Sequence, residues 1–150
     1  MIEEGKQYEN LLSKSVRKAQ GKYYTPDLIV DYILKMTLKN LDVVKNPFIK
    51  VLDPTCGTGF FLERAYEMLL EKFENSISVL NLNYSQENYE YQEEEEIKFL
   101  TGKEYWVKEN IPYHILKNCI YGADIDVKAL AIAKNILLKK QKLTHIKIFS

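Results

Sequence analysis

The chain has 150 residues, of which 46% are hydrophobic and 28% are charged. This balance is typical of one compact domain with a hydrophobic core and excludes a chain that is disordered throughout. The 21 Lys and Arg residues equal the 21 Asp and Glu residues in number, so no overall basic field marks a nucleic-acid binder, and any charged contact must be local.

The N-terminal segment is polar. "MIEEGKQYEN" is too polar for a signal peptide, and no apolar run reaches the ~18 residues of a membrane span, so we expect a soluble, cytoplasmic protein. Residues 1–20 predict a polar helix with a thin apolar side. The basic segment at 17–22 is more typical of a solvated turn than of a phosphate contact, because short basic clusters are common on surfaces.

A second helix is predicted to start at Thr25-Pro26-Asp27. Threonine can cap a helix, proline suits the first helical position, and aspartate complements the positive end of the dipole. Taken alone, Thr25-Pro26 indicates a cap rather than a ligand contact, and Tyr24 indicates a core residue. Apolar residues at helical spacing predict that the helix continues to about residue 40 and packs this face on the core: Leu28, Ile29, Tyr32, Ile33 and Met36.

A buried strand, a glycine turn and a helix are predicted next. "FIKVLD" (48–53) is short, β-branched and apolar, as a buried strand should be. Asp53-Pro54 ends it, and "FFLERAYEMLLEKF" (60–73) resumes helical periodicity. The segment 75–110 is polar and carries an acidic run at 93–96, which predicts a surface insertion with one or two short helices. Its charge would repel a phosphate backbone, so it is a poor candidate for a DNA-facing side.

The C-terminal part predicts a second strand, "CIYGADID" (119–126), a helix at 127–140, and a third strand, "THIKIFS" (144–150). The helix offers apolar side chains for burial at Leu130, Ala131, Ala133, Ile136 and Leu137. Strands that alternate with helices predict an α/β fold with parallel strands, in which ligands bind at the carboxyl ends of the strands.

The glycine turn is the clearest candidate for a ligand site. Gly57 and Gly59 allow a tight turn and a close approach of a ligand to the main chain. A dinucleotide fingerprint would place a third glycine where Leu62 stands, and a phosphate-binding loop would continue with Lys-Ser or Lys-Thr, which is absent. Asp53 would repel a pyrophosphate, but it can order the loop or reach an ammonium group. We therefore expect a ligand with positive charge.

A second acid supports this expectation. Asp124 ends the second predicted strand, where doubly wound folds place a carboxylate that accepts hydrogen bonds from ribose hydroxyls. An adenosine with a cationic amino-acid tail would satisfy both Asp53 and Asp124. S-adenosylmethionine is such a molecule.

Three segments carry a family resemblance. "DPTCGTGFFL" (53–62) resembles the first motif of amino-group DNA methyltransferases, above all the adenine-N6 enzymes of restriction–modification systems, which include type I modification subunits and fused type II restriction–methylation enzymes. "GKYYTP" (21–26) is similar to the motif that precedes it in the gamma order of that family, and "IYGADID" (120–126) is similar to its second motif. Three motifs in the family's order form a more specific match than one glycine loop.

The resemblance implies a set of cofactor-binding residues. The glycine turn would cradle the methionine moiety, the acid after the second strand would bind the ribose, the next apolar residue would pack on the adenine, and the upstream motif would close over the methionine end. Phe60 and Phe61 match a position that is often filled by bulky apolar residues, while Asp126 can equally be a helix cap. The implied cofactor-binding residues are Tyr24, Thr25, Asp53, Thr55, Gly57, Gly59, Asp124 and Ile125.

Other reactive side chains have structural interpretations. Cys56 and Cys119 lie far apart without a CxxC partner, which indicates neither a disulfide framework nor a zinc site, and Cys56 has no activating cation nearby in the sequence. His114 and His145 lack partners at useful spacing. We therefore expect these four residues to be structural or surface residues, and we expect no metal site.

The resemblance also predicts what this chain cannot do alone. Adenine-N6 enzymes carry an Asn/Asp-Pro-Pro-aromatic tetrapeptide that holds the target amine of a flipped base, and the sequence contains none. We expect residues 1–40 to be a helical segment and 41–150 to be the first half of the cofactor domain, a partial doubly wound (Rossmann-like) fold with its first three parallel strands. Such a fragment should not methylate DNA by itself, and its exposed strand edge should favour self-association.

The implied partners are DNA in the full-length enzyme and specificity or restriction subunits. Two other interpretations stay open. One is a fragment of a methyltransferase that acts on a small molecule, RNA or protein, which has no particular need for "GKYYTP". The other is a non-catalytic interaction module, which predicts no cofactor affinity and unchanged partner binding when Asp53 and Asp124 are both replaced by alanine.

Overall fold

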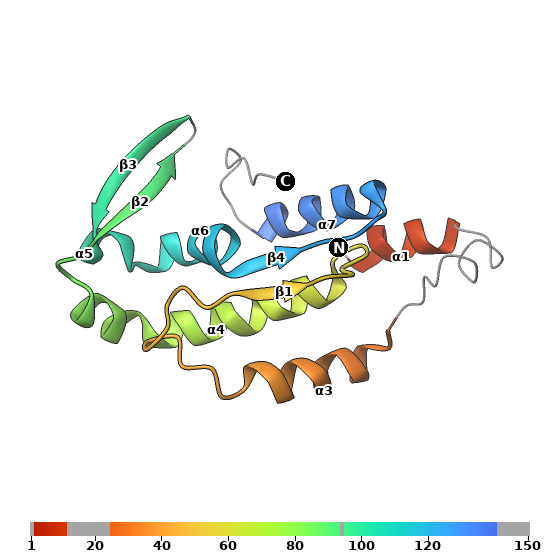
Figure 1. Cartoon of the computed structure of the whole chain (residues 1–150), viewed down its shortest axis with the longest axis horizontal. Coiled ribbons are helices and arrows are strands. Elements are labelled where there is room, and N and C mark those ends of the chain that lie inside the picture. Colours follow the sequence, from red (N-terminus) through yellow and green to blue (C-terminus); the bar gives the residue numbers. More distant parts are fainter. Residues whose placement is uncertain (1, 12–24, 94, 141–150) are drawn as a thin grey trace.

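The computed structural model describes residues 2–11, 25–93 and 95–140 (Figure 1). In chain order its elements are α1 (Ile2–Leu11), α3 (Asp27–Leu38), β1 (Val51–Asp53), α4 (Phe60–Asn83), β2 (Asn88–Glu93), β3 (Glu96–Thr101), α5 (Gly102–Tyr105), η1 (Lys108–Asn110), α6 (Ile111–His114), η2 (Ile115–Cys119), β4 (Ile120–Gly122) and α7 (Val127–Lys140). The fold is mixed α/β, as the alternation of strand and helix patterns predicts. The strand expected at 144–150 lies outside the described residues.

The centre of the fold is a short parallel sheet of β1 and β4, which lie side by side in Figure 1. Val51 pairs with Ile120, and Asp53 pairs with Gly122. Val51 and Ile120 join the hydrophobic core, and α4 packs against both strands. The other face carries Leu52 and its neighbour Tyr121, which are 63% and 40% exposed. Helices therefore cover one face of this sheet in the described part of the chain.

Helix α3 starts and packs differently from the sequence-based expectation. Its first residue is Asp27, Pro26 occupies the N-cap, and no side chain of the described residues caps the helix, so Thr25 is not the cap. The Pro26 carbonyl instead accepts hydrogen bonds from the amides of Ile29 (2.9 Å) and Val30 (3.1 Å). The expected stripe of core residues is also wrong, because all five of its members are exposed: Leu28, Ile29, Tyr32, Ile33 and Met36.

The buried stripe of α3 lies on the opposite side of the helix. Val30, Leu34 and Leu38 are buried against Ala65 of α4. Apolar residues occur on both sides of this helix, so periodicity alone identifies a helix but not the side that faces the core. The small Ala65 side chain, which is 1% exposed, lets the two helices approach closely at this point.

The segment expected as a surface insertion contributes to the core. Helix α4 does not end near residue 73 but continues to Asn83, and an antiparallel β2–β3 hairpin follows that projects from the body of the molecule in Figure 1. Tyr89 of the hairpin is 6% exposed, and Tyr105 and Trp106 are completely buried or nearly so. Tyr89 stacks on Tyr105, Trp106 stacks on Phe73 of α4, and Tyr89 meets Trp106 edge-on. Short helices do follow, but their aromatic residues are core rather than surface.

His114 lies at the middle of this aromatic cluster. It is fully buried, and its ring packs edge-on against Phe73 and Trp106. Nε2 lies 2.6 Å from the Pro47 carbonyl oxygen, which can only accept, so Nε2 carries the proton. Nδ1 then accepts a hydrogen bond of 2.9 Å from the Tyr105 hydroxyl. Both ring nitrogens are satisfied by the protein, which gives His114 the structural role expected of it; His145 lies outside the described residues.

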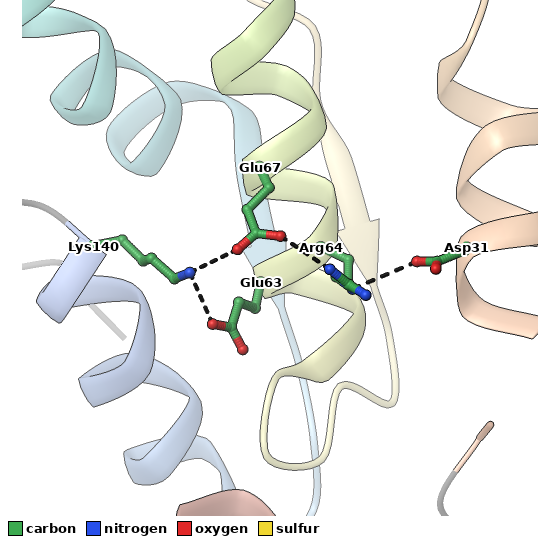
Figure 2. A network of polar contacts seen from close by, with 5 residues as sticks. All are labelled: Asp31, Glu63, Arg64, Glu67 and Lys140. Carbon is green, nitrogen blue, oxygen red and sulfur yellow. Dashed lines mark hydrogen bonds and ion pairs between the residues drawn. The ribbon is translucent and has the colours of Figure 1, made fainter. Parts of the chain in front are cut away.

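A network of charged side chains ties the three long helices together (Figure 2). Lys140 of α7 binds two carboxylates of α4, Glu63 at 3.0 Å and Glu67 at 2.7 Å. Glu67 also binds Arg64 at 3.3 Å, and Arg64 reaches Asp31 of α3 at 3.5 Å. Glu63 is only 5% exposed, so removal of Lys140 would leave a buried charge without its partner. The network fixes α7 and α3 against the helix that follows the glycine turn.

Helix α7 matches its predicted bounds, and Ala133, Ile136 and Leu137 are buried as expected. Ala129 is buried as well, whereas Leu130 is half-buried and Ala131 is exposed. Of the helices that the structure describes, none has the length and apolar character needed to cross a membrane.

Candidate functional site

The glycine turn joins β1 directly to α4. Asp53 ends β1, and its Oδ1 accepts a hydrogen bond of 3.1 Å from the Thr55 amide. The Cys56 carbonyl accepts from the Gly59 amide at 2.8 Å, and the Gly59 carbonyl accepts from the Glu63 amide at 2.8 Å. The turn is therefore closed by its own backbone, and its last glycine is the N-cap of α4.

Both glycines of the turn have left-handed backbone conformations, with φ of 53° at Gly57 and 88° at Gly59. A Cβ added at Gly59 would lie 2.7 Å from the Cβ of Ala133, so only glycine lets the turn lie this close to α7. Within the described part of the chain, a Cβ at Gly57 would meet no heavy atom within 4 Å. The space beside the Gly57 backbone is thus open, as the close approach of a ligand requires.

The end of β4 is bonded to the same turn. The Ala123 amide donates to the Asp53 carbonyl at 2.9 Å, and the Cys56 amide donates to the Ala123 carbonyl at 2.9 Å. The turn also packs tightly on β4, because a Cβ at Gly122 would lie 2.6 Å from Leu62 Cδ1 and 2.9 Å from Cys56 Sγ. The two segments that the sequence analysis selected separately are one structural unit.

Asp124 makes the most informative contact of this unit. Its Oδ2 accepts a hydrogen bond of 2.8 Å from the Gly57 amide, although the two residues are 67 positions apart. Its Oδ1 accepts another of 2.8 Å from the Asp126 amide. Ile125, between the two acids, is 96% exposed. The structure thus brings together five of the eight predicted residues: Asp53, Thr55, Gly57, Gly59 and Asp124, with Ile125 adjoining them.

The remaining two predicted residues belong to the upstream motif. Thr25 is half-buried just before α3, and in the described part of the chain it makes no hydrogen bond to the glycine turn. Tyr24 lies outside the described residues. The role of both residues in a ligand site remains a prediction.

The site has a negative electrostatic character. Burial raises the pKa of Asp53; the hydrogen bond from the Thr55 amide opposes this rise, and the charge of Asp124 adds a smaller increase. The same causes, burial first and then the charges of Asp53 and Asp124, raise the pKa of the Cys56 thiol to about 11. Cys56 is therefore a neutral thiol at pH 7, which agrees with its expected role and excludes an activated nucleophile. A cation bound here would relieve the repulsion between the carboxylates.

Two contacts of the site, both made by helix α1, were not predicted from the sequence. Asp126 caps α7 by accepting from the amides of Lys128 (3.0 Å) and Ala129 (3.3 Å), as its position suggested. Its other oxygen accepts a hydrogen bond of 2.9 Å from the hydroxyl of Tyr8 on α1. Gly5 of α1 lies against Thr58 of the turn. The only sign of these contacts in the sequence was that Gly5 and Tyr8 are three positions apart, a spacing that places two residues on the same face of a helix.

The residues around the glycine turn fit a ligand with hydroxyl groups and a positive charge. Two carboxylates, an open glycine backbone and an exposed apolar residue surround the end of the parallel sheet. The carboxylates can accept hydrogen bonds both from hydroxyl groups and from a positively charged ammonium group. Among the described residues, no group of three His, Cys, Asp or Glu side chains is arranged to hold a metal ion.

One comparison with known protein families gives a match. The model of the family described as N-6 DNA Methylase matches residues 4–150, which include the glycine turn, the segment of Asp124 and helix α1 from its third residue onward. The match therefore covers nearly the whole chain, and with it every element that forms the site. The chain belongs to the N-6 DNA methylase family.

Proposed function

We propose that the chain binds S-adenosylmethionine at the glycine turn and serves a site-specific DNA adenine-N6 methyltransferase. Family membership supports the methyltransferase activity and DNA as the substrate. The observation that carries the cofactor proposal is the hydrogen bond of 2.8 Å between Asp124 and the Gly57 amide. It joins an acid at the end of one parallel strand to the glycine turn at the end of its neighbour, where α/β folds bind nucleotides.

Each residue of the site has a distinct part in this proposal. Asp53 and the backbone of Gly57 hold the charged methionine end. Asp124 accepts hydrogen bonds from the ribose hydroxyls, since each carboxylate oxygen has two lone pairs and only one is used by Gly57 or Asp126. Ile125 packs on the adenine ring, for which its exposed side chain is available. Tyr24 and Thr25 close over the methionine end.

When bound, the cofactor would supply an activated methyl group. In the complete enzyme an adenine turned out of the duplex would receive it. The Asn/Asp-Pro-Pro-aromatic tetrapeptide that positions the adenine amine in such enzymes does not occur in this sequence, so we propose that this chain alone binds the cofactor and does not methylate DNA. The proposed setting is a cytoplasmic restriction–modification system with specificity or restriction partners.

The proposal is tested by calorimetric titration of S-adenosylmethionine into the purified chain and into two variants. Asp124→Asn removes the charge and one acceptor of the site, and we expect it to weaken binding by about 1–3 kcal/mol, the usual loss for a charge-assisted hydrogen bond. Glu109→Gln is the matched control, because it removes one negative charge from an exposed residue elsewhere. We expect it to bind as the wild type does.

Two outcomes would contradict this assignment. Absence of binding to the folded wild-type chain would show that the turn does not form a cofactor site in this chain. Equal weakening by Asp124→Asn and Glu109→Gln would show that net charge, and not the contact of Asp124 with the ligand, determines affinity.

We also propose that the chain self-associates through its parallel sheet. Leu52 and Tyr121 lie side by side on the open face, whereas parallel sheets are normally covered on both faces. Leu52→Lys should shift the chain toward the monomer in a concentration series by light scattering, and Phe99→Lys on the exposed hairpin should not. A wild-type chain that stays monomeric throughout the series would overturn this part of the proposal.

A further inference from the structure

Helix α1 touches the candidate site at two places, and the α1 residues that make these contacts, Gly5 and Tyr8, lie outside the three motifs. The first is the hydrogen bond of 2.9 Å from the Tyr8 hydroxyl to Oδ2 of Asp126, between residues 118 positions apart. Because the acceptor is a carboxylate, this is a charge-assisted bond, which is stronger than a bond between neutral groups. It engages Oδ2 of Asp126, whereas Oδ1 of the same side chain caps the α7 amides.

The second contact lies on the turn itself. Gly5 is buried, and a Cβ added to it would lie 2.8 Å from Oγ1 and 3.1 Å from Cβ of Thr58. Thr58 stands between the two glycines of the turn and is 7% exposed. The helix backbone therefore rests directly on the residue between Gly57 and Gly59. Any larger residue at position 5 would push α1 and the turn apart.

These contacts are connected to the ligand-binding atoms by a short chain of hydrogen bonds. Tyr8 holds the Asp126 side chain, the Asp126 amide donates to Asp124 at 2.8 Å, and Asp124 accepts from the Gly57 amide at 2.8 Å. The acid proposed to bind the ribose and the glycine proposed to face the methionine end are thus oriented by one network. Tyr8 is at the outer end of this network, on helix α1, which lies next to α7 (Figure 1).

We propose that α1 braces the glycine turn, with Tyr8 and Gly5 as positioning residues that set the affinity of the cofactor site without touching the cofactor. The consequence for affinity rests on the proposed function, whereas the brace itself does not. A fixed turn binds its ligand more tightly because no free energy is lost in ordering it at the moment of binding. Loss of the brace should lower affinity while the core of β1, α4 and the aromatic cluster stays intact.

The brace is tested first without any ligand, by NMR hydrogen exchange of individual amides in the whole chain. Tyr8→Phe removes only the hydroxyl. We expect exchange of the Gly57 amide to accelerate by roughly three- to tenfold, less than the full effect of a charge-assisted bond because Tyr8 acts on Gly57 only through Asp126 and Asp124. Amides inside α4, such as that of Leu69, should keep their rates. Tyr32→Phe is the matched control, because Tyr32 is 64% exposed on α3. Unchanged Gly57 exchange in Tyr8→Phe overturns the brace.

The steric contact gives a second, independent test. Gly5→Ala should also accelerate exchange at Gly57, and in the double variant Gly5→Ala/Thr58→Ala the rate should return toward that of Thr58→Ala alone, because the closest atom, Oγ1, has been removed. If Gly5→Ala accelerated Gly57 exchange only through poorer folding, a second substitution would not slow the exchange again. Absence of this rescue counts against the contact.

The effect on function is measured by calorimetry with S-adenosylmethionine, at a temperature where both proteins are fully folded. We expect Tyr8→Phe to bind about three- to tenfold more weakly than the wild type, with the melting temperature of the free chain almost unchanged. Faster Gly57 exchange with unchanged affinity overturns the role of the brace in binding. If the wild type itself does not bind, the proposed function fails, and the exchange data alone decide whether α1 is a brace.

Discussion

Replacement of Gly59 by alanine should reduce the free energy of unfolding by about 2–5 kcal/mol. The new Cβ would be 2.7 Å from Cβ and 3.0 Å from Cα of Ala133, at a residue whose φ is 88°. Left-handed backbone costs a residue other than glycine roughly 1–2 kcal/mol, and overpacking of this kind typically adds about 1–3 kcal/mol. Urea unfolding followed by circular dichroism would measure the loss.

Gly57→Ala is the matched control for this prediction. Its φ of 53° is also left-handed, but its Cβ would meet nothing within 4 Å, so only the backbone cost of roughly 1–2 kcal/mol is expected. The double variant Gly59→Ala/Ala133→Gly lacks the nearest atom, Ala133 Cβ. It should therefore recover part of the stability that Gly59→Ala loses beyond Gly57→Ala. Equal losses for Gly57→Ala and Gly59→Ala would show that the turn does not rest on α7.

Acid should destabilise the chain through His114. Burial lowers the pKa of His114 from 6.5 to about 4, although its bond to the Pro47 carbonyl opposes this shift. Between about pH 6.5 and about pH 4 the unfolded chain binds a proton that the folded chain excludes, so stability must fall as the pH falls through this window. The shift corresponds to a loss of about 3 kcal/mol from this residue, and protonation of the folded state prevents a further loss below about pH 4.

A variant isolates this contribution from that of the carboxylates. His114→Gln removes the titrating group and keeps a donor for Pro47, so it should be less stable than the wild type at pH 7 but should lose less stability on acidification. The difference between the unfolding free energies of the wild type and His114→Gln should shrink by about 3 kcal/mol from pH 7 to pH 4. A difference that stays constant with pH would mean that His114 does not titrate between the two states.

The sequence indicated that the acids and glycines lie together, and it predicted the packing around them less well. The acids and glycines could be found because each has a local reason: a turn with positive φ requires Gly57 and Gly59, and acids at strand ends point to a ligand. Their connection through the Asp124–Gly57 bond follows from parallel pairing of β1 and β4, which the strand–helix–strand order already indicates.

What could not be predicted depends on contacts between distant segments. Helix α3 has apolar residues on two sides, and only contacts with distant segments, such as that with Ala65 of α4, decide that Val30 faces the core instead of Met36. The β2–β3 hairpin is rich in Glu, so its pattern resembles a surface loop, but Tyr89 packs on Tyr105 with ring centroids 4.5 Å apart. Tyr8 likewise reaches a residue that no local pattern connects to it.

The central claim is that the glycine turn and Asp124 form the S-adenosylmethionine site, and an NMR titration of the labelled chain with this cofactor tests it most directly. The amide signals of Gly57, Gly59 and Ile125 should shift most and saturate together, while amides of the β2–β3 hairpin should keep their positions. Shifts that are largest at other residues, or the absence of saturable shifts in the folded chain, would contradict the claim.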